Sequence, residues 1–205
     1  IPEDFGRAFI IMAVSFVFAM LSEQVVDVKQ LRRVNRALKT LSACNQAVIR
    51  ATDESQLVHE ICRVITEEGG YRMAWVGYAE DDEGKSVKPV AYAGCEDGYL
   101  ETLNITRSDT ERGRGPTGTA IRIGKPSIAL PLTANGETFG ALNICSKEKD
   151  AFDDEEVKLL TELAGDLAYG ITALRMRAER QLSERALREA HQLLSFHVER
   201  MPLGH

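Results

Sequence analysis

Two short apolar runs of the chain meet at the dipeptide Asn135-Gly136. This dipeptide is the strongest short hairpin signal, because a type I′ turn needs a positive φ at both central residues. A two-residue loop would pair Leu132 with Phe139 and Leu130 with Ala141. Alternation then predicts two apolar faces: Ile128, Leu130, Leu132, Phe139 and Ala141 on one, and Ala129, Pro131, Gly140, Leu142 and Ile144 on the other. Such a sheet must be covered on both sides, and its proline indicates an edge or a bulge.

A long helix is predicted after the hairpin. Asp153 is placed to cap its first turn, Glu156 follows as the reciprocal partner of a capping box, and Phe152 precedes the cap as a hydrophobic staple. No proline falls between Asp153 and Arg200, so the pattern predicts one helix of about 45 residues, typical of a coiled coil or a connecting rod. Its apolar positions recur at threes and fours: Leu160, Leu163, Leu167, Ile171 and Leu174.

A second helical segment precedes the central region and has heptad-like spacing. Its apolar and seam positions are Leu31, Val34, Leu38, Leu41, Asn45 and Val48. Asparagine at such a position fixes the register of a coiled coil at some cost in stability. Together with the later helix, this spacing predicts a parallel homodimer through Leu31, Val34, Leu38, Leu41, Asn45 and Val48, and through Leu160, Leu163, Leu167 and Leu174.

The segment 8–21 is largely apolar and contains no charged residue, and it is followed by Lys29, Arg32 and Arg33. Fourteen residues fall short of the roughly 20 that span a bilayer. Two interpretations stay open, the end of a membrane span with a cytoplasmic basic flank and a helix that is buried or dimerised in solution. The positive flank favours the membrane. We therefore divide the first part of the chain into an apolar helix, 1–26, and a signalling helix, 27–50.

Composition narrows the function. The chain has 205 residues, of which 44% are hydrophobic, and a net charge of −6. That size supports one core of about 100 to 150 residues with appendages. The acidic excess gives no support for nucleic-acid binding, which usually needs a basic face. The four cysteines, Cys44, Cys62, Cys95 and Cys145, lack the spacing of a zinc site and are expected to be reduced thiols, so no metal ligand is assigned.

Between the two long helices the pattern predicts a helix, two strands at 71–79 and 86–93, an irregular segment, a short helix, the hairpin and the closing helix. The segments YRMAWVGYAEDD, AYAG, GPTGTAIRIGKP, IALPL, GALNI and FDDEEV follow in this order. In that order they resemble the GAF domains of bacterial sensor histidine kinases and diguanylate cyclases, over residues 43–175. The resemblance implies an α+β fold, in which helices cover one face of an antiparallel sheet and a ligand pocket lies on the other.

One departure from the family concerns the lid of that pocket. About two dozen residues usually separate the GKP turn from the IALPL strand, whereas here Ser127 follows Pro126 directly. The lid is expected to be missing between residues 126 and 127, either deleted or unseen.

The resemblance implies a small-molecule pocket and does not identify its ligand. Candidate ligand-binding residues lie on or after the two strands and at the start of the short helix: Trp75, Tyr92, Cys95, Tyr99, Thr117 and Thr119. Each has a plainer interpretation, since strand aromatics are more often core residues and Thr117 suits a helix cap.

The special ligands of the family find no support in this sequence. Ile144 follows Asn143 where cyclic-nucleotide GAF domains carry lysine, and no cysteine is followed by histidine as in many bilin-binding domains. His59 is the one histidine inside the domain, on a helix where it is an ordinary residue, so heme is also unsupported. The cofactor stays unknown.

The C-terminal segment, 176–205, is expected to be a coiled-coil linker ending in FHVERMPLG. This stretch resembles a histidine kinase phosphoacceptor box around His197, and it resembles more closely the start of a PAS domain. Phosphotransfer favours a carboxylate directly after the histidine, and Val198 occupies that position. We expect the PAS alternative.

The sequence therefore predicts a regulatory, non-catalytic GAF module of a bacterial sensor. It would relay the state of its pocket through dimeric helices to a downstream domain of the same chain. The expected location is cytoplasmic, with a tether to the inner face of the cell membrane if residues 8–21 end a span. The alternatives are a GAF-fold free methionine sulfoxide reductase and a purely structural dimerisation unit.

Overall fold

The computed structural model describes residues 2–94, 100, 105–110, 113–123, 129–146 and 152–199. In chain order the elements are α1 (Pro2–Arg50), α2 (Glu54–Glu67), β1 (Met73–Ala79), β2 (Val87–Gly94), α4 (Pro116–Ile123), β3 (Ala129–Ala134), β4 (Glu137–Cys145) and α5 (Asp154–Glu199). The expected lid between 126 and 127 and the PAS-like residues 200–205 lie outside the described residues, as do the candidates Cys95 and Tyr99.

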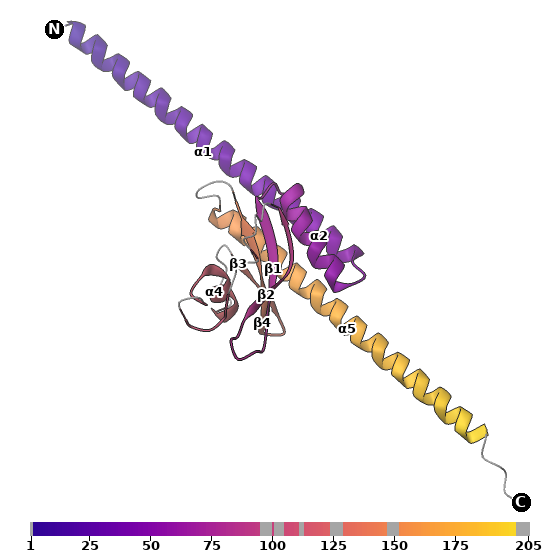
Figure 1. Ribbon diagram of the computed structural model, residues 1–205. Coiled ribbons are helices and arrows are strands. Elements are labelled where there is room, and N and C mark those ends of the chain that lie inside the picture. Colours follow the sequence, from indigo (N-terminus) through magenta and orange to yellow (C-terminus); the bar gives the residue numbers. More distant parts are fainter. Residues whose placement is uncertain are drawn as a thin grey trace, which may run out of the picture.

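The four strands form one antiparallel sheet in the order β2-β1-β4-β3. Helices α1, α2 and α5 lie together on one face, which we call the helical face, and α4 lies on the other, which we call the distal face (Figure 1). The main core fills the helical face, with Ile61, Val76, Leu142 and Leu167 among its buried members. The α+β architecture expected from the resemblance is confirmed.

The hairpin forms at the predicted place with a different register. Asn135 and Gly136 have φ values of +54° and +83°, as a type I′ turn requires. Leu132 faces Gly140, however, and Leu130 faces Leu142, because the register shifts beside Leu132. Phe139 is the extra residue of this β-bulge. The predicted faces were therefore wrong: Leu130, Leu132, Leu142 and Ile144 share the helical face, and Ala129 and Ala141 share the distal face.

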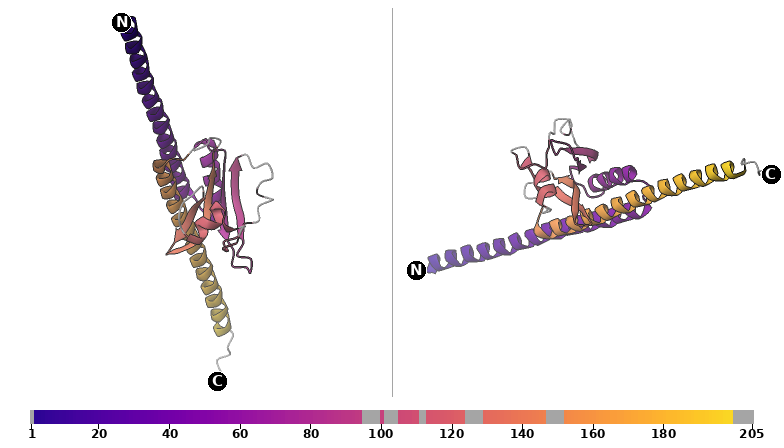
Figure 2. Two further views of the ribbon diagram at one scale, coloured as in Figure 1. Left: turned by 90° about the vertical axis from the view of Figure 1, so that its left-hand side faces the viewer. Right: turned by 90° about the horizontal axis from the view of Figure 1, so that it is seen from below.

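Helices α1 and α5 run side by side in the same direction along the helical face (Figure 2, right). Arg36 contacts Glu156, and a methyl group at Gly170 would come within 2.8 Å of Val48 Cγ1, so the two helices meet at both ends of the overlap. Beyond it, α1 extends past one end of the domain and α5 past the other (Figure 1). We call the overlapping pair the spine.

The start of α5 confirms one half of the predicted capping box. Asp153 Oδ1 accepts a hydrogen bond from the backbone N–H of Glu156 at 2.8 Å. The Glu156 carboxylate accepts bonds from Arg36 and Tyr71 instead of returning one to the cap. Phe152, the residue predicted to form a staple, stacks on Tyr71, with ring centroids 6.0 Å apart. The single helix predicted after the hairpin is present and has 46 residues.

The predicted dimer residues divide into two groups. Leu160, Leu163 and Leu167 are buried in the core of this chain, and Leu174 packs against it. Leu41 and Val48 of α1 also pack on that core. These side chains cover the sheet of their own chain, so a second copy would need other residues. Leu31 and Leu38 are 69% and 48% exposed, whereas Val34 and Asn45 are half-buried.

The apolar start of α1 was predicted to be the end of a membrane span or a buried or dimerised helix. Across the described residues, helices with the length and apolarity needed to cross a membrane are absent.

Candidate functional site

Strand β1 presents alternate residues to the two faces of the sheet. Ala74 and Val76 belong to the main core on the helical face. Met73 and Trp75 form a separate buried cluster with Leu100 on the distal face. A Cβ atom at Gly77 would come within 2.8 Å of the Trp75 ring, so the indole lies directly over this glycine. Trp75 is 2% exposed, so it is a packed side chain and not the exposed wall of a ligand pocket.

A row of side chains crosses the sheet through Trp75. The strand register places Tyr92 opposite Trp75 on one side and Asn143 opposite it on the other. Asn143 is 4% exposed, and its Oδ1 accepts a hydrogen bond of 2.7 Å from Thr117 Oγ1 at the start of α4. A buried amide is costly unless it is hydrogen-bonded, so this bond fixes α4 over the row. We call Tyr92, Trp75, Asn143 and Thr117 the distal row.

The structure brings three of the six candidate ligand residues into this row. Thr117 is buried within it, Trp75 forms its centre, and Tyr92 lies at its open end with 54% exposure. Thr119 is apart from the row, and its hydroxyl donates to the carbonyl of Arg114 at 3.3 Å. Asn143 was missed as a site residue. The available signal was an amide at an inward position of an otherwise apolar strand, which needs a buried partner.

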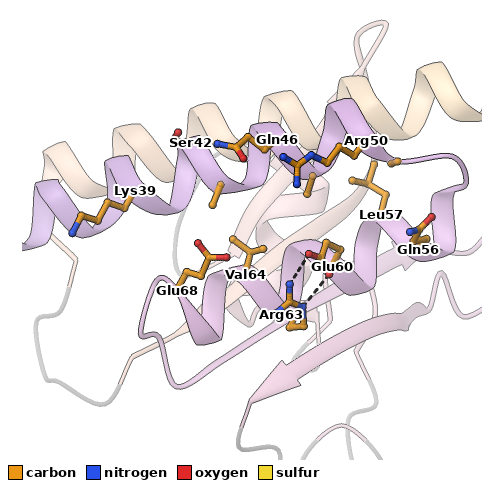
Figure 3. Close-up of a pocket in the computed structure, with 13 residues that line it drawn as sticks. Lys39, Ser42, Gln46, Arg50, Gln56, Leu57, Glu60, Arg63, Val64 and Glu68 are labelled. Atoms are coloured by element: carbon orange, nitrogen blue, oxygen red, sulfur yellow. Dashed lines mark hydrogen bonds and ion pairs between the residues drawn. The ribbon is translucent and has the colours of Figure 1, made fainter.

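An open hollow lies elsewhere, between α1 and α2 (Figure 3). This open groove has a volume of about 670 Å³. Lys39 and Arg50 line it on α1, and Glu60 on α2 and Glu68 at the end of α2 line the other side. The remaining lining residues are polar or apolar: Ser42, Ala43, Gln46, Ala47, Ala51, Gln56, Leu57, Arg63 and Val64. Arg63 is held by Glu60 across 2.6 Å. The groove has mixed charge and contains no member of the distal row.

Arg36 joins α1 to the start of α5 through a buried carboxylate. Its Nη2 donates to Glu156 Oε1 at 2.7 Å, and Tyr71 OH donates to the same oxygen at 2.7 Å. The guanidinium also lies 4.5 Å from the centre of the Tyr71 ring. Burial raises the pKa of Tyr71, and the hydrogen bond to Glu156 raises it further. We call Arg36, Glu156, Tyr71 and Phe152 the first clamp.

Arg175 makes a similar cluster where α5 leaves the domain. Its Nε and Nη2 donate to the two carboxylate oxygens of Glu54, at 2.7 and 2.6 Å. The guanidinium lies 4.9 Å from the ring centres of both Tyr78 and Phe139. Arginine suits both roles, because its planar fork binds a carboxylate with two bonds and stacks on aromatic rings. We call Arg175, Glu54, Tyr78 and Phe139 the second clamp.

The pKa values in the second clamp follow from its partial burial. Burial tends to raise the pKa of Glu54, but hydrogen bonds from Arg175 and the charge of Arg175 outweigh it and leave that pKa below its usual value. Burial raises the pKa of Tyr78 strongly, and the nearby Glu54 carboxylate adds to the effect. The Tyr78 hydroxyl is close enough to Glu54 to influence it, but has no hydrogen-bond partner of good geometry in the described part.

The described cysteines do not gather at the distal row. Cys44 and Cys62 are buried on the helical side, and burial raises the pKa of each thiol to about 12. Cys145 is half-buried beside the cluster of Met73 and Trp75. Among the described residues, groups of three or more histidine, cysteine or acidic side chains that could hold a metal ion are absent.

Comparison with known proteins agrees with this architecture. A family profile described as "GAF domain" matches residues 123–172. The structure is similar to the GAF domain of a phosphoenolpyruvate-protein phosphotransferase from Coxiella burnetii, with a TM-score of 0.57 and 20% identity over 71% of this chain and 98% of that one. No curated protein matches the chain.

Two further solved structures show how widely the fold is used. Free methionine-R-sulfoxide reductase from Neisseria meningitidis, in complex with its substrate, has a TM-score of 0.58 and 20% identity over 69% of this chain and 91% of that one. A segment of a methyl-accepting chemotaxis protein has a TM-score of 0.51 and 12% identity over 65% of this chain and 97% of that one. The central domain of the chain thus has the GAF fold, which serves several functions.

Proposed function

We propose that this chain is a regulatory, non-catalytic GAF module of a bacterial signalling protein. Its distal row would sense a small molecule, and its spine would carry the result to a downstream domain of the same chain. One observation carries the proposal. The sheet that bears the distal row is packed directly on α5, which runs beside α1, and these two long helices project from opposite ends of the domain (Figure 1). A change in the sheet therefore has a direct route to the spine.

The chemistry of the distal row suits a small ligand with an apolar ring and a polar edge. Trp75 offers a large aromatic surface, and Thr117 and Asn143 offer a hydroxyl and an amide that presently satisfy each other. A ligand would have to replace that bond with its own, because a buried amide left unpaired is costly. The test is native mass spectrometry and a thermal-shift screen of nucleotides, aromatic acids and small metabolites. A ligand at a hundred times its dissociation constant stabilises the fold by about 2.7 kcal/mol.

The screen is repeated on Tyr92→Ala and on Thr119→Ala. Tyr92 is exposed at the end of the row, whereas Thr119 lies outside it, so only the first substitution should weaken the response. If none of the compounds raises the melting temperature, and native mass spectrometry finds no retained molecule, the sensing role fails. The chain would then be a structural dimerisation module.

A parallel homodimer is part of the proposal. Apolar residues at heptad spacing follow one side of α1 and are between 47% and 82% exposed: Val14, Val17, Leu21, Val28, Leu31, Leu38 and Ile49. This stripe includes Leu31 and Leu38, which also belong to the seam predicted from the sequence. Leu41 and Val48 of the predicted seam are not part of the stripe, because they pack on the core of their own chain. A second copy laid against it in parallel would bury an a/d seam that is mostly apolar, with polar residues at positions such as Asn35 and Ser42.

Light scattering at tens of micromolar tests the dimer. The chain should have twice its monomer mass, and Leu31→Glu with Leu38→Glu should return it to the monomer mass. Lys39→Glu with Arg50→Glu is the matched control, because these side chains line the groove toward α2 instead. A monomeric wild-type chain would contradict the proposal.

A GAF-fold reductase is the alternative from another class, favoured by the likeness to the Neisseria enzyme. The positions of Cys44 and Cys62 support the regulatory role, since both thiols are buried on the helical side, away from the distal row. Turnover of free methionine sulfoxide by the purified chain with a thiol reductant would establish the reductase.

The setting of the module is also a proposal. The parent would be a histidine kinase or a diguanylate cyclase, with a PAS domain after α5. Phosphorylation of His197 by a cognate kinase domain would contradict the PAS assignment. The start of α1 would attach to the inner face of the cell membrane, because Met12 and Phe16 are exposed on one side of the helix and Val14 and Val17 on another. Flotation with anionic lipid vesicles tests the attachment, with the segment 28–199 as the control that should not float.

A further inference from the structure

Strand β1 and the residues just before it link both clamps to the distal row. Tyr71 lies two residues before the strand and belongs to the first clamp, and Tyr78 lies near its end and belongs to the second. Trp75, between them, faces the opposite side of the sheet. Six residues lie between the two tyrosines, a bend at Arg72 and then five residues of the strand, so the two lie at most about 23 Å apart. The strand therefore reaches from one end of the spine's contact with the sheet to the other.

Each clamp ties a tyrosine of this region to a long helix by the same three contacts. An arginine of the spine lies over the tyrosine ring, Arg36 at 4.5 Å and Arg175 at 4.9 Å. Each arginine also holds a glutamate in the first turn of a different helix, Glu156 of α5 or Glu54 of α2. Each ring packs with a phenylalanine. Because the contact with the tyrosine ring and the ion pair share one guanidinium, moving the ring disturbs the ion pair as well.

The link from the distal row to the strand is a close one. The Trp75 ring lies over Gly77, in the space that a Cβ atom would occupy, and the register between β1 and β2 shifts between Val76 and Gly77. Interiors are densely packed, so a displaced indole cannot move without shifting its neighbours. Gly77 is the residue next to Tyr78, whose ring carries Arg175.

We infer that β1 acts as a lever, which couples the distal row to both Arg–Glu–Tyr clamps at once. Movement of Trp75 would change the contact between α1 and α5 at Glu156 and the hold on α5 at Arg175 together. The spine would then respond at both ends of the domain and not at one. This inference deepens the proposed relay and rests on it for its biological meaning. Its physical content, the coupling, can be measured without any ligand.

The first test follows the Nε–Hε signals of Arg36 and Arg175 by NMR, assigned from their loss in Arg36→Gln and Arg175→Gln. Trp75→Phe should shift both signals by more than their linewidth. Ile121→Val is the matched control: it shortens a buried distal-face side chain that belongs to α4, and should shift neither. A shift of one signal alone, or of neither, in Trp75→Phe overturns the lever.

The second test does not need a change at Trp75 and covers the case in which that variant fails to fold. The unfolding equilibrium constants of Arg36→Gln, Arg175→Gln and the double variant are compared. Substitutions this far apart normally change stability independently, so that their fold-changes in the unfolding equilibrium constant multiply. The lever predicts instead that the fold-change in the double variant differs from the product of the two single fold-changes by roughly threefold or more. Arg36→Gln combined with Arg63→Gln on the exposed side of α2 should give the simple product. A simple product for the two clamps overturns the lever.

These outcomes are separable from those of the ligand screen. If the clamps are coupled but the screen finds no ligand, the lever stands and the sensing role fails. If the screen finds a ligand but the clamps are independent, the sensing role stands and the lever fails.

Discussion

Arg36 and Glu156 meet across 2.7 Å although 120 residues separate them in the chain. The carboxylate is fully buried, and the Arg36 side chain is 23% exposed. This difference decides how the pair responds to substitution. Glu156 depends on Arg36 and Tyr71 for its partners, because its second oxygen has none in the described part of the chain. Arg36 can turn toward water when its partner is lost.

Arg36→Gln should therefore cost more stability than Glu156→Gln. The first leaves a buried carboxylate without its cation, at about 3 kcal/mol, and the second loses hydrogen bonds worth about 1 to 2 kcal/mol. Urea denaturation of both variants measures the difference. Glu155→Gln, at the exposed neighbouring position, is the control and should change the free energy of unfolding little. Equal losses for the two variants would refute the asymmetry.

Asp153→Ala should destabilise the chain by about 1 kcal/mol, because the N–H of Glu156 loses its acceptor. Asp154→Ala removes a neighbouring acid in the first turn that makes no such bond in the described contacts, and should cost less. Thermal denaturation compares the two, with roughly 2 to 4 °C expected for each kcal/mol in a chain of this size. Identical melting temperatures would show that the cap contributes nothing.

The Arg175–Glu54 pair should stabilise the fold in a pH-dependent way. The pKa of Glu54 is lowered in the folded state, so its contribution is present above the unfolded value of 4.5 and is lost as the pH falls through the folded value. The difference in free energy of unfolding between the wild type and Glu54→Gln should be about 1 kcal/mol near neutral pH. It should shrink below about pH 4. Exposed Glu179→Gln serves as the control. A difference that stays constant into strong acid would contradict the assignment.

Cys44 and Cys62 should resist alkylation in the native state. Both thiols are almost fully buried, and their pKa values of about 12 leave only about one thiolate in ten thousand near pH 8. Iodoacetamide labelling followed by peptide mass spectrometry should find both unmodified until urea is added. The half-buried Cys145 provides an internal comparison. Native labelling of Cys44 or Cys62 as fast as of a small thiol would mean that the core opens readily.

Thr117→Val should cost about 1 to 3 kcal/mol, because the buried Asn143 oxygen loses its donor while the side-chain shape is kept. Thr119→Val is the matched control, since that hydroxyl makes only a 3.3 Å bond to a backbone carbonyl. The free energies of unfolding decide between them. If the two valine variants are equally stable, the bond to Asn143 does not hold α4 on the sheet.

Much of the fold follows from local rules. The Asn135-Gly136 turn, the cap at Asp153 and the long uninterrupted helix each depend on neighbouring residues, and each was predicted. The hairpin register was not, because one extra residue at Phe139 reverses the faces of the strands beyond it. This bulge places the Phe139 ring beside Arg175, a residue far along the chain. No local pattern contains that contact.

The site shows the same division. Trp75 and Thr117 were recognised from their positions on a strand and at a helix start, but the partner of Thr117 depends on which strands are neighbours. Glu156 fits the spacing of a capping box, and its actual partners come from α1 and from the residues just before β1. A rule for nearby residues correctly located the helix start and wrongly assigned the glutamate's role.

The spine passes beside the sheet and not through it. Helices α1 and α5 contact each other directly along their shared length, so in the proposed relay the domain would only modulate the stiffness of this junction. The angle by which one projecting helix is rotated relative to the other can then be changed by inserting residues. Adding seven residues to α5 beyond Arg175 rotates the far end of that helix by only about 20°. Adding two residues instead rotates it by about 200°. Output from an attached domain should survive the first insertion and reverse or fail with the second.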